Sequence, residues 1–342
     1  MSSGALLLGV ASLLTSALLT ALVRRLAVAH GFLDIPNVRS SHSCATPRGG
    51  GMAIVVTATA AVLVLAAQGS VPRDLCMALV GGGTAVAVVG FVDDRFAVPA
   101  SVRLAVHLLA AAWAVYWLGG LTAVRLGDHT APLGWLGGAL AVLGIVWVLN
   151  LFNFMDGIDG IAASEAVFVA CAGALLSPAG SGVTGAAGVF AGACAGFLLW
   201  NWPPAKIFLG DVGSGYLGYA IAVLALAATR ADSAAVWVWL ILGGVFFVDA
   251  TVTLLRRLLR GERVYEAHRS HAYQWLARRW GSHAKVTATV LTVNVLWLLP
   301  CAVFATRRPG FAVATVLFAL APLVLLAVAT SGRREANDRG HR

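Results

Sequence analysis

The sequence predicts an all-α fold, a polytopic integral membrane helix bundle with about eleven transmembrane helices. Three observations lead to this class. Of the 342 residues, 59% are hydrophobic and only 11% are charged. The mean hydropathy of +0.85 is typical of a membrane protein rather than a soluble domain. Apolar runs of about 17 to 22 residues, which suffice to cross a hydrocarbon core as helices, recur along the whole chain.

The expected spans all approach the length that a membrane-crossing helix needs. In chain order they are 4–23, 52–67, 75–92, 101–118, 134–150, 161–177, 183–200, 214–229, 234–255, 286–305 and 310–330. No basic residue precedes the first run and no small-residue cleavage site follows it, so we expect a retained helix rather than a signal peptide. Residues 1–331 then form a single transmembrane domain, and residues 332–342 form a polar cytosolic tail.

The distribution of basic residues predicts the orientation. With the N-terminus outside, most of the 24 lysines and arginines fall in inner loops, as the positive-inside rule requires. The C-terminus is then cytosolic. The net charge of +9 is explained by this asymmetry in a lipid bilayer and predicts no nucleic-acid partner. The five cysteines are scattered without CxxC spacing, so neither a disulfide framework nor a zinc site is expected.

A polar insert separates the spans 134–150 and 161–177. It contains Asn150, Asn153, Asp156 and Asp159, together with glycines beside both acids. The two acids are three residues apart and share one face if the segment is helical. The glycines remove side-chain bulk and let an anion–metal complex approach the backbone. A simple connection between helices does not need this combination, so we expect a functional site here.

A second acidic position is the pair Asp93 and Asp94, which follows an apolar run. Adjacent like charges at a helix end are unfavourable unless a cation or phosphate chemistry uses them. The alternative is a solvated helix end before Pro99, because an acid at the interface costs little. The sequence alone leaves both interpretations open.

A third insert, residues 201–215, holds Asp211 among glycines at the start of a helix. Free N–H groups at such a position favour anions, and the carboxylate can hold a hard cation. Phe208 offers a flat face to a base or sugar, or serves as an interfacial anchor. Lys206 lies in the same insert.

Two further loops carry candidates for phosphate binding. His42 and Arg48 lie among turn residues of the first inner loop, where an ordinary basic loop is an equal alternative. The cluster His268-Arg269-Ser270-His271 suits phosphate recognition and lacks the further ligands of a zinc site. Asp249, at membrane depth, is expected to face the bundle interior, either as a catalytic acid or paired with Arg256 or Arg257.

The predicted orientation brings the acids of three separate inserts to the cytosolic face, so we expect one shared site. These acids are Asp93, Asp94, Asp156, Asp159 and Asp211. Carboxylates near basic groups can hold Mg²⁺ on a diphosphate and orient an attacking phosphate oxygen.

The motifs at these positions resemble those of the polyprenyl-phosphate N-acetylhexosamine-1-phosphate transferases. They are Asn-x-x-Asn-x-x-Asp-Gly-x-Asp-Gly-Ile at 150–161, Asp-Asp at 93–94, Phe-Leu-Gly-Asp-Val-Gly-Ser at 208–214 and His-Arg-Ser-His at 268–271. The resemblance extends from about Asp34 to Gln274, with the motifs in the family's order. The family includes UDP-GlcNAc:undecaprenyl-phosphate GlcNAc-1-phosphate transferases and, more distantly, the phospho-N-acetylmuramoyl-pentapeptide translocases of peptidoglycan synthesis.

The resemblance implies that an N-acetylated amino-sugar 1-phosphate passes from a UDP-N-acetylhexosamine to undecaprenyl phosphate, with release of UMP. It implies a Mg²⁺-dependent enzyme, with Mn²⁺ as a substitute, in the bacterial cytoplasmic (inner) membrane. By matching position, Asp211 would bind the metal, and Asp93 and Asp94 would face the lipid phosphate, one of them taking its proton. The substrate-binding residues would be His42, Arg48, Asn150, Asn153, Asp156, Asp159, Lys206, Phe208 (against the uracil), His268, Arg269 and His271.

Two departures from the peptidoglycan enzymes bear on the sugar. Those enzymes have a lysine in the first loop and a triple-histidine motif, whereas this chain has His42, Arg48 and Arg269. A smaller sugar, as in the initiation of O-antigen, capsule or teichoic acid, is therefore favoured over the muramoyl-pentapeptide. Direct attack and a covalent aspartyl intermediate both stay open, as does a homodimer.

Two other classes fit the sequence less well. A secondary transporter would place its acids at the membrane midplane and repeat its halves. A CDP-alcohol phosphotransferase would continue the Asp-Gly pair with Ala-Arg and further spaced acids. Neither pattern is present in the chain.

Overall fold

The computed structural model describes residues 3–35, 45–262 and 270–339. Most of these residues are helical, which confirms the predicted all-α class. In the first half of the chain the helices are α1 (Ser3–Ala29), α2 (Gly51–Ala67), α3 (Arg73–Met77), the π-helical turn η1 (Ala78–Gly82), α4 (Gly83–Phe96), α5 (Ala100–Leu118), α6 (Gly134–Met155) and α7 (Ile161–Leu176). In the second half they are α8 (Val183–Asn201), α9 (Asp211–Ala231), α10 (Ala235–Leu242), α11 (Gly244–Leu259), α12 (Ala272–Trp280), α13 (His283–Val293), the π-helical turn η2 (Asn294–Leu298), α14 (Leu299–Arg307), the 3₁₀ turn η3 (Pro309–Phe311) and α15 (Ala312–Arg339).

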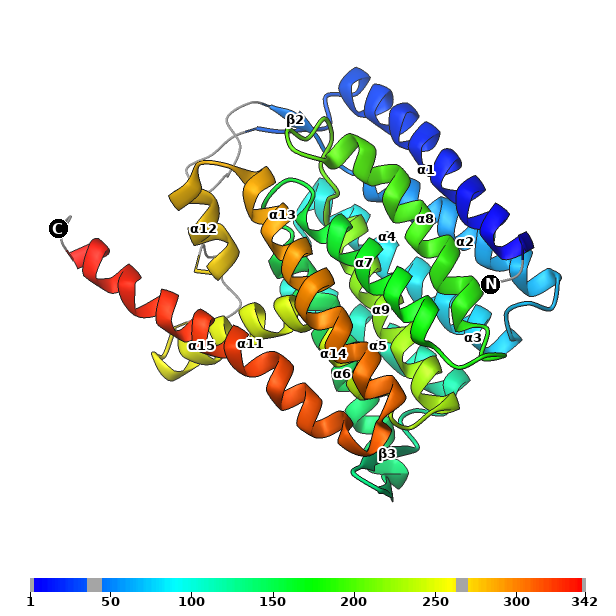
Figure 1. Cartoon of the computed structure of the whole chain (residues 1–342). Coiled ribbons are helices and arrows are strands. Elements are labelled where there is room, and N and C mark those ends of the chain that lie inside the picture. The colour runs from blue at the N-terminus through cyan, green and yellow to red at the C-terminus, as the bar shows by residue number, and fades with distance from the viewer. Residues whose placement is uncertain (1–2, 36–44, 263–269, 340–342) are drawn as a thin grey trace.

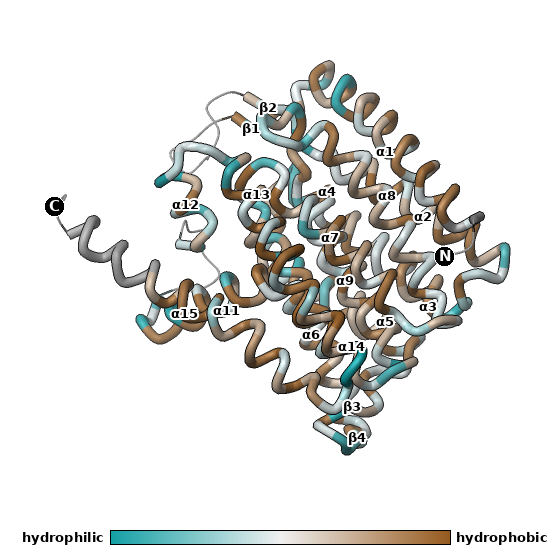
Figure 2. Tube along the Cα trace, in the orientation of Figure 1, coloured by the Kyte–Doolittle hydropathy of each residue, from teal (hydrophilic) through white to brown (hydrophobic). Residues whose placement is uncertain are grey.

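Each of the eleven expected spans coincides with one helix or with consecutive helices of the structure. Within the described ranges, eight helices are long and apolar enough to cross a membrane, and a bent pair makes a ninth if counted as one span. The helices α2 and α7 are apolar but shorter. Figure 2 shows hydrophobic residues along the bundle helices and hydrophilic residues gathered mainly toward the ends.

The expected span 234–255 is broken in the structure, where α10 and α11 meet at an angle of 77°. The break falls at Gly243 and Gly244, which impose little resistance to a change of chain direction. A Cβ added to Gly244 would lie 2.6 Å from Leu320 Cδ2, so glycine at this position lets α11 approach the α15 side chains closely. The apolar run alone did not predict this bend.

Two short antiparallel strand pairs were not predicted. The strands β1 (Leu33–Asp34) and β2 (Thr46–Pro47) pair at one end of the bundle, where β2 contacts α1. The strands β3 (Ala123–Leu126) and β4 (His129–Pro132) form a hairpin at the opposite end (Figure 1).

The centre of the bundle is α9, the most completely buried of the long apolar helices. It packs against α4 and α6, where small residues let the backbones approach. A Cβ on Gly218 would lie 2.6 Å from the Leu149 Cα, and one on Gly90 would lie 2.4 Å from the Asp211 carbonyl oxygen. This close packing fixes the start of α9 against the ends of α4 and α6, where the predicted acids lie.

Candidate active site

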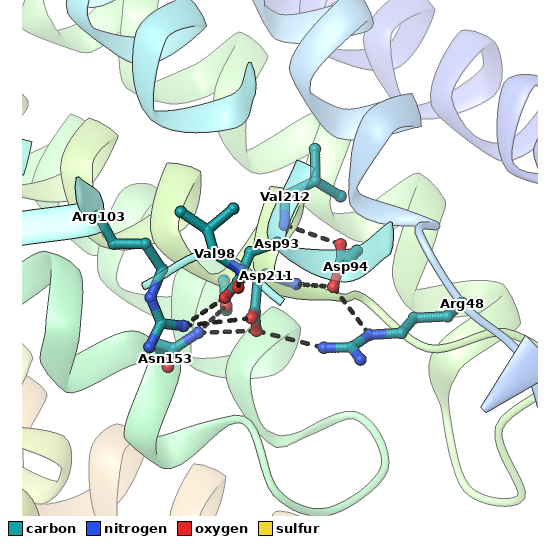
Figure 3. A network of polar contacts seen from close by, with 9 residues as sticks. Arg48, Asp93, Asp94, Val98, Arg103, Asn153, Asp211 and Val212 are labelled. Atoms are coloured by element: carbon teal, nitrogen blue, oxygen red, sulfur yellow. Dashed lines mark hydrogen bonds and ion pairs between the residues drawn. The ribbon is translucent and has the colours of Figure 1, made fainter. Parts of the chain in front are cut away.

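Five segments meet at the start of α9. They are the loop after β2, the C-terminal end of α4, the beginning of α5, the C-terminal end of α6 and the first turn of α9 itself (Figure 3). Each contributes a charged or amide side chain: Arg48, Asp93 with Asp94, Arg103, Asn153 and Asp211. Residues from four of the predicted inserts thus lie in one network.

Asp94 holds the first turn of α9. Its Oδ1 accepts a hydrogen bond from the main-chain N–H of Asp211 (2.8 Å), and its Oδ2 accepts one from Val212 (3.1 Å). The Arg48 Nε lies 2.8 Å from Oδ1, and the Asp94 side chain is fully buried. A carboxylate at this position satisfies two N–H groups that a helix start leaves unpaired. Asp94 was expected to face the lipid phosphate beside Asp93, but its oxygens are instead occupied by α9 and Arg48.

Asp93 and Asp211 lie side by side, close enough for their carboxyl groups to interact directly. The Asp93 carboxylate accepts hydrogen bonds from the Val98 N–H (2.6 Å) and from Arg103 Nη1. The Asp211 carboxylate has Arg48 Nη2 at 3.4 Å on one oxygen and Arg103 Nη1 at 3.9 Å on the other. Two arginines therefore compensate the charge of the two acids.

Asn153, at the end of α6, is a further partner of the Asp211 carboxylate and orients it. Its Nδ2 donates to Asp211 Oδ1 (3.0 Å) and to Ser214 Oγ (3.0 Å). These contacts leave the Asp211 side chain 27% exposed, so part of its carboxylate remains accessible to a ligand.

A divalent metal ion fits this donor set with the help of a substrate. Among the described residues, no group of three or more histidine, cysteine or acidic side chains is placed to enclose a metal. Mg²⁺ usually takes one or two protein carboxylates and completes its octahedron with phosphate oxygens and water. The adjacent carboxylates of Asp93 and Asp211 match that requirement, because two acids in contact favour a bound cation even beside Arg48 and Arg103.

A cavity of about 130 Å³ opens beside these carboxylates. It lies between α4, α5, α6 and α9, and its polar lining residues are Asp93, Arg103, His107, Asn150, Asn153 and Asp211. Asn150 donates its Nδ2 to the Val146 carbonyl oxygen (2.7 Å), which fixes the carboxamide against its own helix.

Asp156 and its neighbour Gly157 follow the end of α6. Burial, together with the charges of Asp211, Asp94 and Asp159, raises the pKa of Asp156 to about 8, and Arg48 opposes this shift. Gly157 has no room for a side chain, because an added Cβ would lie 2.2 Å from the Tyr273 hydroxyl. That hydroxyl donates to the Phe154 carbonyl oxygen (3.0 Å) and joins α12 to the acidic insert.

Asp159 connects three segments. Its Oδ2 accepts a hydrogen bond from the Ala205 N–H (3.1 Å) and lies 3.3 Å from His283 Nδ1. Its main-chain oxygen accepts a hydrogen bond from the Thr287 hydroxyl (3.1 Å). Asp159 thus fixes α13 and the 203–205 turn to the acidic insert, which was expected to contact the nucleotide sugar.

Asp249 caps α12. Its carboxylate accepts hydrogen bonds from the N–H groups of Ala272 (2.8 Å) and Tyr273 (3.0 Å) and from the Thr253 hydroxyl (3.2 Å). His271 Nδ1 lies 3.4 Å from the same carboxylate. These contacts support a structural role for Asp249. Its partners are N–H groups of α12 and not Arg256 or Arg257, which the sequence suggested.

The remaining predicted residues are dispersed around the network. The His271 ring is buried and stacks on Phe154 at a centroid distance of 6.4 Å. The Lys206 Nζ lies 5.5 Å from the Trp200 ring centroid, and the Phe208 backbone pairs with Pro47 and Gly50 beside Arg48. His42, His268 and Arg269 lie outside the described residues.

Sequence reasoning missed Arg103, His107, Ser214 and His283 as site residues. Arg103 was counted as an orientation signal, although it lies on the first turns of the helix that follows Asp93 and Asp94. His107 carried a usable signal, because an ionisable residue inside an apolar span is rarely placed there without a function. Ser214 lies within the motif at 208–214 but was assigned no role, and His283 carries no such signal, since its partner Asp159 lies 124 residues away in the chain.

Comparisons with known proteins give concordant similarities. Residues 75–229 match the sequence profile of glycosyl transferase family 4. The chain is 30% identical over 313 residues to the probable undecaprenyl-phosphate N-acetylglucosaminyl 1-phosphate transferase of Bacillus subtilis, covering 84% of this chain and 85% of the relative. It is 28% identical over 327 residues to the decaprenyl-phosphate N-acetylglucosaminephosphotransferase of Mycobacterium tuberculosis (83% and 78%). It is also 33% identical over 246 residues to the phospho-N-acetylmuramoyl-pentapeptide-transferase of Moorella thermoacetica (66% and 74%).

Proposed function

The chain belongs to glycosyl transferase family 4, among the polyprenyl-phosphate N-acetylhexosamine-1-phosphate transferases, and from this premise we propose that it transfers an N-acetylated amino-sugar 1-phosphate from a UDP-sugar to undecaprenyl phosphate. An oxygen of the lipid phosphate forms a bond to the β-phosphorus of the donor, the one that bears the sugar. The bond from that phosphorus to the bridging oxygen breaks, and UMP leaves with the bridging oxygen. The products are UMP and a lipid-linked sugar diphosphate.

The observation that carries this proposal is the pair Asp93 and Asp211 between Arg48 and Arg103, at the mouth of a cavity among membrane helices. Both substrates are anionic, so their reaction requires positive charge and exact placement more than a strong nucleophile. A bound Mg²⁺ would neutralise the donor diphosphate and polarise its phosphorus centre. Asp211, with Asp93 beside it, would hold that ion.

The chain's own residues then have separate tasks. Asp93 is the acid that is placed to take a proton from the lipid phosphate, because it lines the cavity. Asn153 orients Asp211, and Arg48 and Arg103 can move from the carboxylates to the substrate phosphates. Asp94 acts as a positioning residue, since it holds the start of α9.

Relatives named for N-acetylglucosamine transfer align over 83–84% of the chain, and the muramoyl-pentapeptide relative over 66%. Together with the departures of Arg48 and Arg269 from the motifs of the peptidoglycan enzymes, these longer alignments favour a small N-acetylated sugar and the initiation of a lipid-linked envelope glycan. The active site then faces the cytosol, where UDP-sugars are available, in the cytoplasmic membrane of a bacterium.

The test is UMP release from purified protein in detergent, supplied with undecaprenyl phosphate and Mg²⁺. UDP-GlcNAc, a UDP-6-deoxy-N-acetylhexosamine and UDP-muramoyl-pentapeptide are offered separately, with Asp211→Asn as the control. We expect release from one of the two smaller donors, dependent on lipid, metal and Asp211. Folded protein that releases no UMP from any donor would contradict the proposal.

A further inference from the structure

The cavity beside Asp93 and Asp211 has two layers. The outer layer consists of Asp93, Arg103, Asn153 and Asp211, at the ends of the four helices that form the walls. The lining continues on each helix three or four residues farther into the bundle, which is about one turn, or 5.4 Å, deeper. The residues of this inner layer are Val89 and Gly90 on α4, His107 on α5, Asn150 on α6 and Gly215 on α9.

The inner layer is apolar except for His107 and Asn150. Leu104, Leu149 and Val86 complete its walls. His107 lies four residues after Arg103 on α5, so the two side chains share one helix face and one cavity. A polar ring within a membrane helix is costly unless it has a polar partner or a ligand. The imidazole offers both a donor and an acceptor at the apolar side of the carboxylates.

The two substrates approach this cavity from different sides. A nucleotide sugar is fully water-soluble and arrives at the outer layer. A polyprenyl phosphate carries its phosphate on an apolar chain and arrives from the membrane side, where the inner layer lies. Since one water molecule needs roughly 10–15 Å³ of such space, the cavity volume of about 130 Å³ is large enough for a phosphate group.

We propose that His107, with Asn150, binds a non-attacking oxygen of the polyprenyl phosphate and thereby holds the acceptor beneath the Asp93–Asp211 pair. The inference rests on the proposed transferase function and deepens it, because it assigns the acceptor to the inner layer of the cavity. A hydrogen bond from the imidazole N–H orients the phosphate without adding a charge. Arg103, one turn above, supplies the charge compensation at the outer layer.

The first test compares His107→Leu, His107→Gln and wild type in the UMP-release assay, with the two substrates varied in turn. A lost hydrogen bond to a charged phosphate predicts a KM for undecaprenyl phosphate raised about ten- to a hundredfold in His107→Leu. The KM for the UDP-sugar stays near the wild-type value. His107→Gln keeps a donor of similar reach and recovers most of the loss. His30→Leu, the same exchange at an exposed position near the cytosolic end of α1, serves as the matched control.

A second test does not depend on turnover. Binding to the folded protein raises its thermal midpoint, so undecaprenyl phosphate and undecaprenol are each added without donor or metal. We expect stabilisation of wild type and His107→Gln by the phosphate lipid beyond that by the alcohol, and loss of this difference in His107→Leu. An unchanged difference, a rise in the donor KM instead, or equal defects in the Leu and Gln variants would overturn the assignment. Absence of UMP release from wild type with a normal lipid-phosphate shift would contradict only the transferase function.

Discussion

Asp94 binds the start of α9 through the main-chain N–H of Asp211, at 2.8 Å, so one acid of the network fixes the position of another. The neighbouring Asp93 faces the cavity and pairs with Arg103. The two adjacent carboxylates therefore have different partners: Asp94 holds the start of α9, and Asp93 lines the cavity with Arg103 and the Val98 N–H as its partners. This division predicts different consequences for their substitution.

Asp94→Ala removes a buried carboxylate that accepts two main-chain hydrogen bonds and an arginine. Hydrogen bonds to charged groups contribute about 1.5–3 kcal/mol, so we expect the free energy of unfolding to fall by about this amount. Asp93→Asn keeps an oxygen that can accept from the Val98 N–H, so it should lower the thermal midpoint less than Asp94→Ala while it lowers kcat by about 10²–10⁴, the range of a lost acid–base group. Thermal unfolding in detergent and UMP release measure both effects. Equal destabilisation by the two variants would contradict the assignment of a structural role to Asp94 and a catalytic role to Asp93.

Gly210 directly precedes α9, and its substitution tests the contact between Asp94 and the start of this helix. Its φ is +76°, and an added Cβ would lie 2.5 Å from Asp94 Oδ2. With ψ at 171° this conformation is one that essentially only glycine adopts, so Gly210→Ala should combine a backbone cost of about 1–3 kcal/mol with displacement of the Asp94 carboxylate. We expect loss of UMP release and a lower thermal midpoint.

Gly180 is a control for substitution at a glycine of positive φ. Its φ is +78°, but an added Cβ would meet nothing within 4 Å. Gly180→Ala should show only the backbone cost and keep full activity. If both glycine variants released UMP at the same rate, the contact between residue 210 and Asp94 would not be important for activity.

Much of this architecture follows from the sequence for a physical reason. Apolar length is set by bilayer thickness, so the runs that became α1, α5, α6 and α15 were recognisable without any tertiary information. Acids bordered by glycine at the ends of such runs, such as Asp156 and Asp211, and adjacent acids at a helix end, such as Asp93 and Asp94, are equally unusual and indicated the candidate site.

Other features depend on contacts between distant segments. Asp93 and Asp94 are adjacent in the sequence, which does not reveal that the Asp93 carboxylate lines a cavity while the Asp94 carboxylate binds a helix start 117 residues away. The bend between α10 and α11 lies where Gly244 contacts Leu320 of α15, a residue 76 positions away in the chain. Arg103 and Lys206 are both basic residues near helix ends, yet only Arg103 lies beside the carboxylates while Lys206 lies over Trp200. Charge placement alone predicts the side of the membrane and not the partner.

Asp249 fixes α12, which carries Tyr273 against the acidic insert. Removing a helix cap costs about 0.5–2 kcal/mol, so Asp249→Ala should loosen the first turn of α12. We expect faster hydrogen exchange at the amides of Ala272 and Tyr273 and reduced activity. Thr253→Val removes only the hydroxyl that donates to Asp249 and should have a smaller effect on both amides. Unchanged exchange in Asp249→Ala would show that α12 does not need this cap.

Asp156 predicts a pH dependence of stability in the metal-free protein. Its raised pKa of about 8 means that the folded state binds a proton between the ordinary carboxyl range and pH 8, where the unfolded state does not. The contribution of this group to stability is therefore complete at low pH and decreases as pH rises toward about 8. The slope is at most about 1.4 kcal/mol per pH unit.

The measurement compares the thermal midpoints of wild type and Asp156→Asn at several pH values without metal. Asparagine carries no titrating proton, so the variant should gain on wild type as pH rises from 5 to 8 and then keep a constant advantage. A difference between the two proteins that does not vary with pH would mean that Asp156 is ionised throughout this range.

Glu165 on α7 and Asn294 in the π-helical turn η2 form a buried polar pair inside the bundle. The Asn294 Nδ2 donates to Glu165 Oε2 at 2.5 Å, while Glu165 Oε1 and Asn294 Oδ1 are buried without a hydrogen-bond partner. One proton on the carboxyl group would satisfy both remaining oxygens, because an acid and a carboxamide can form two parallel hydrogen bonds.

Glu165→Gln supplies the same pattern with an amide and should leave the thermal midpoint close to wild type. Glu165→Leu leaves Asn294 unpaired in an apolar environment and should cost about 1–3 kcal/mol. If Glu165→Gln were as destabilising as Glu165→Leu, the pair would instead depend on an ionised Glu165 carboxylate. A positively charged group elsewhere in the bundle would then have to balance that carboxylate.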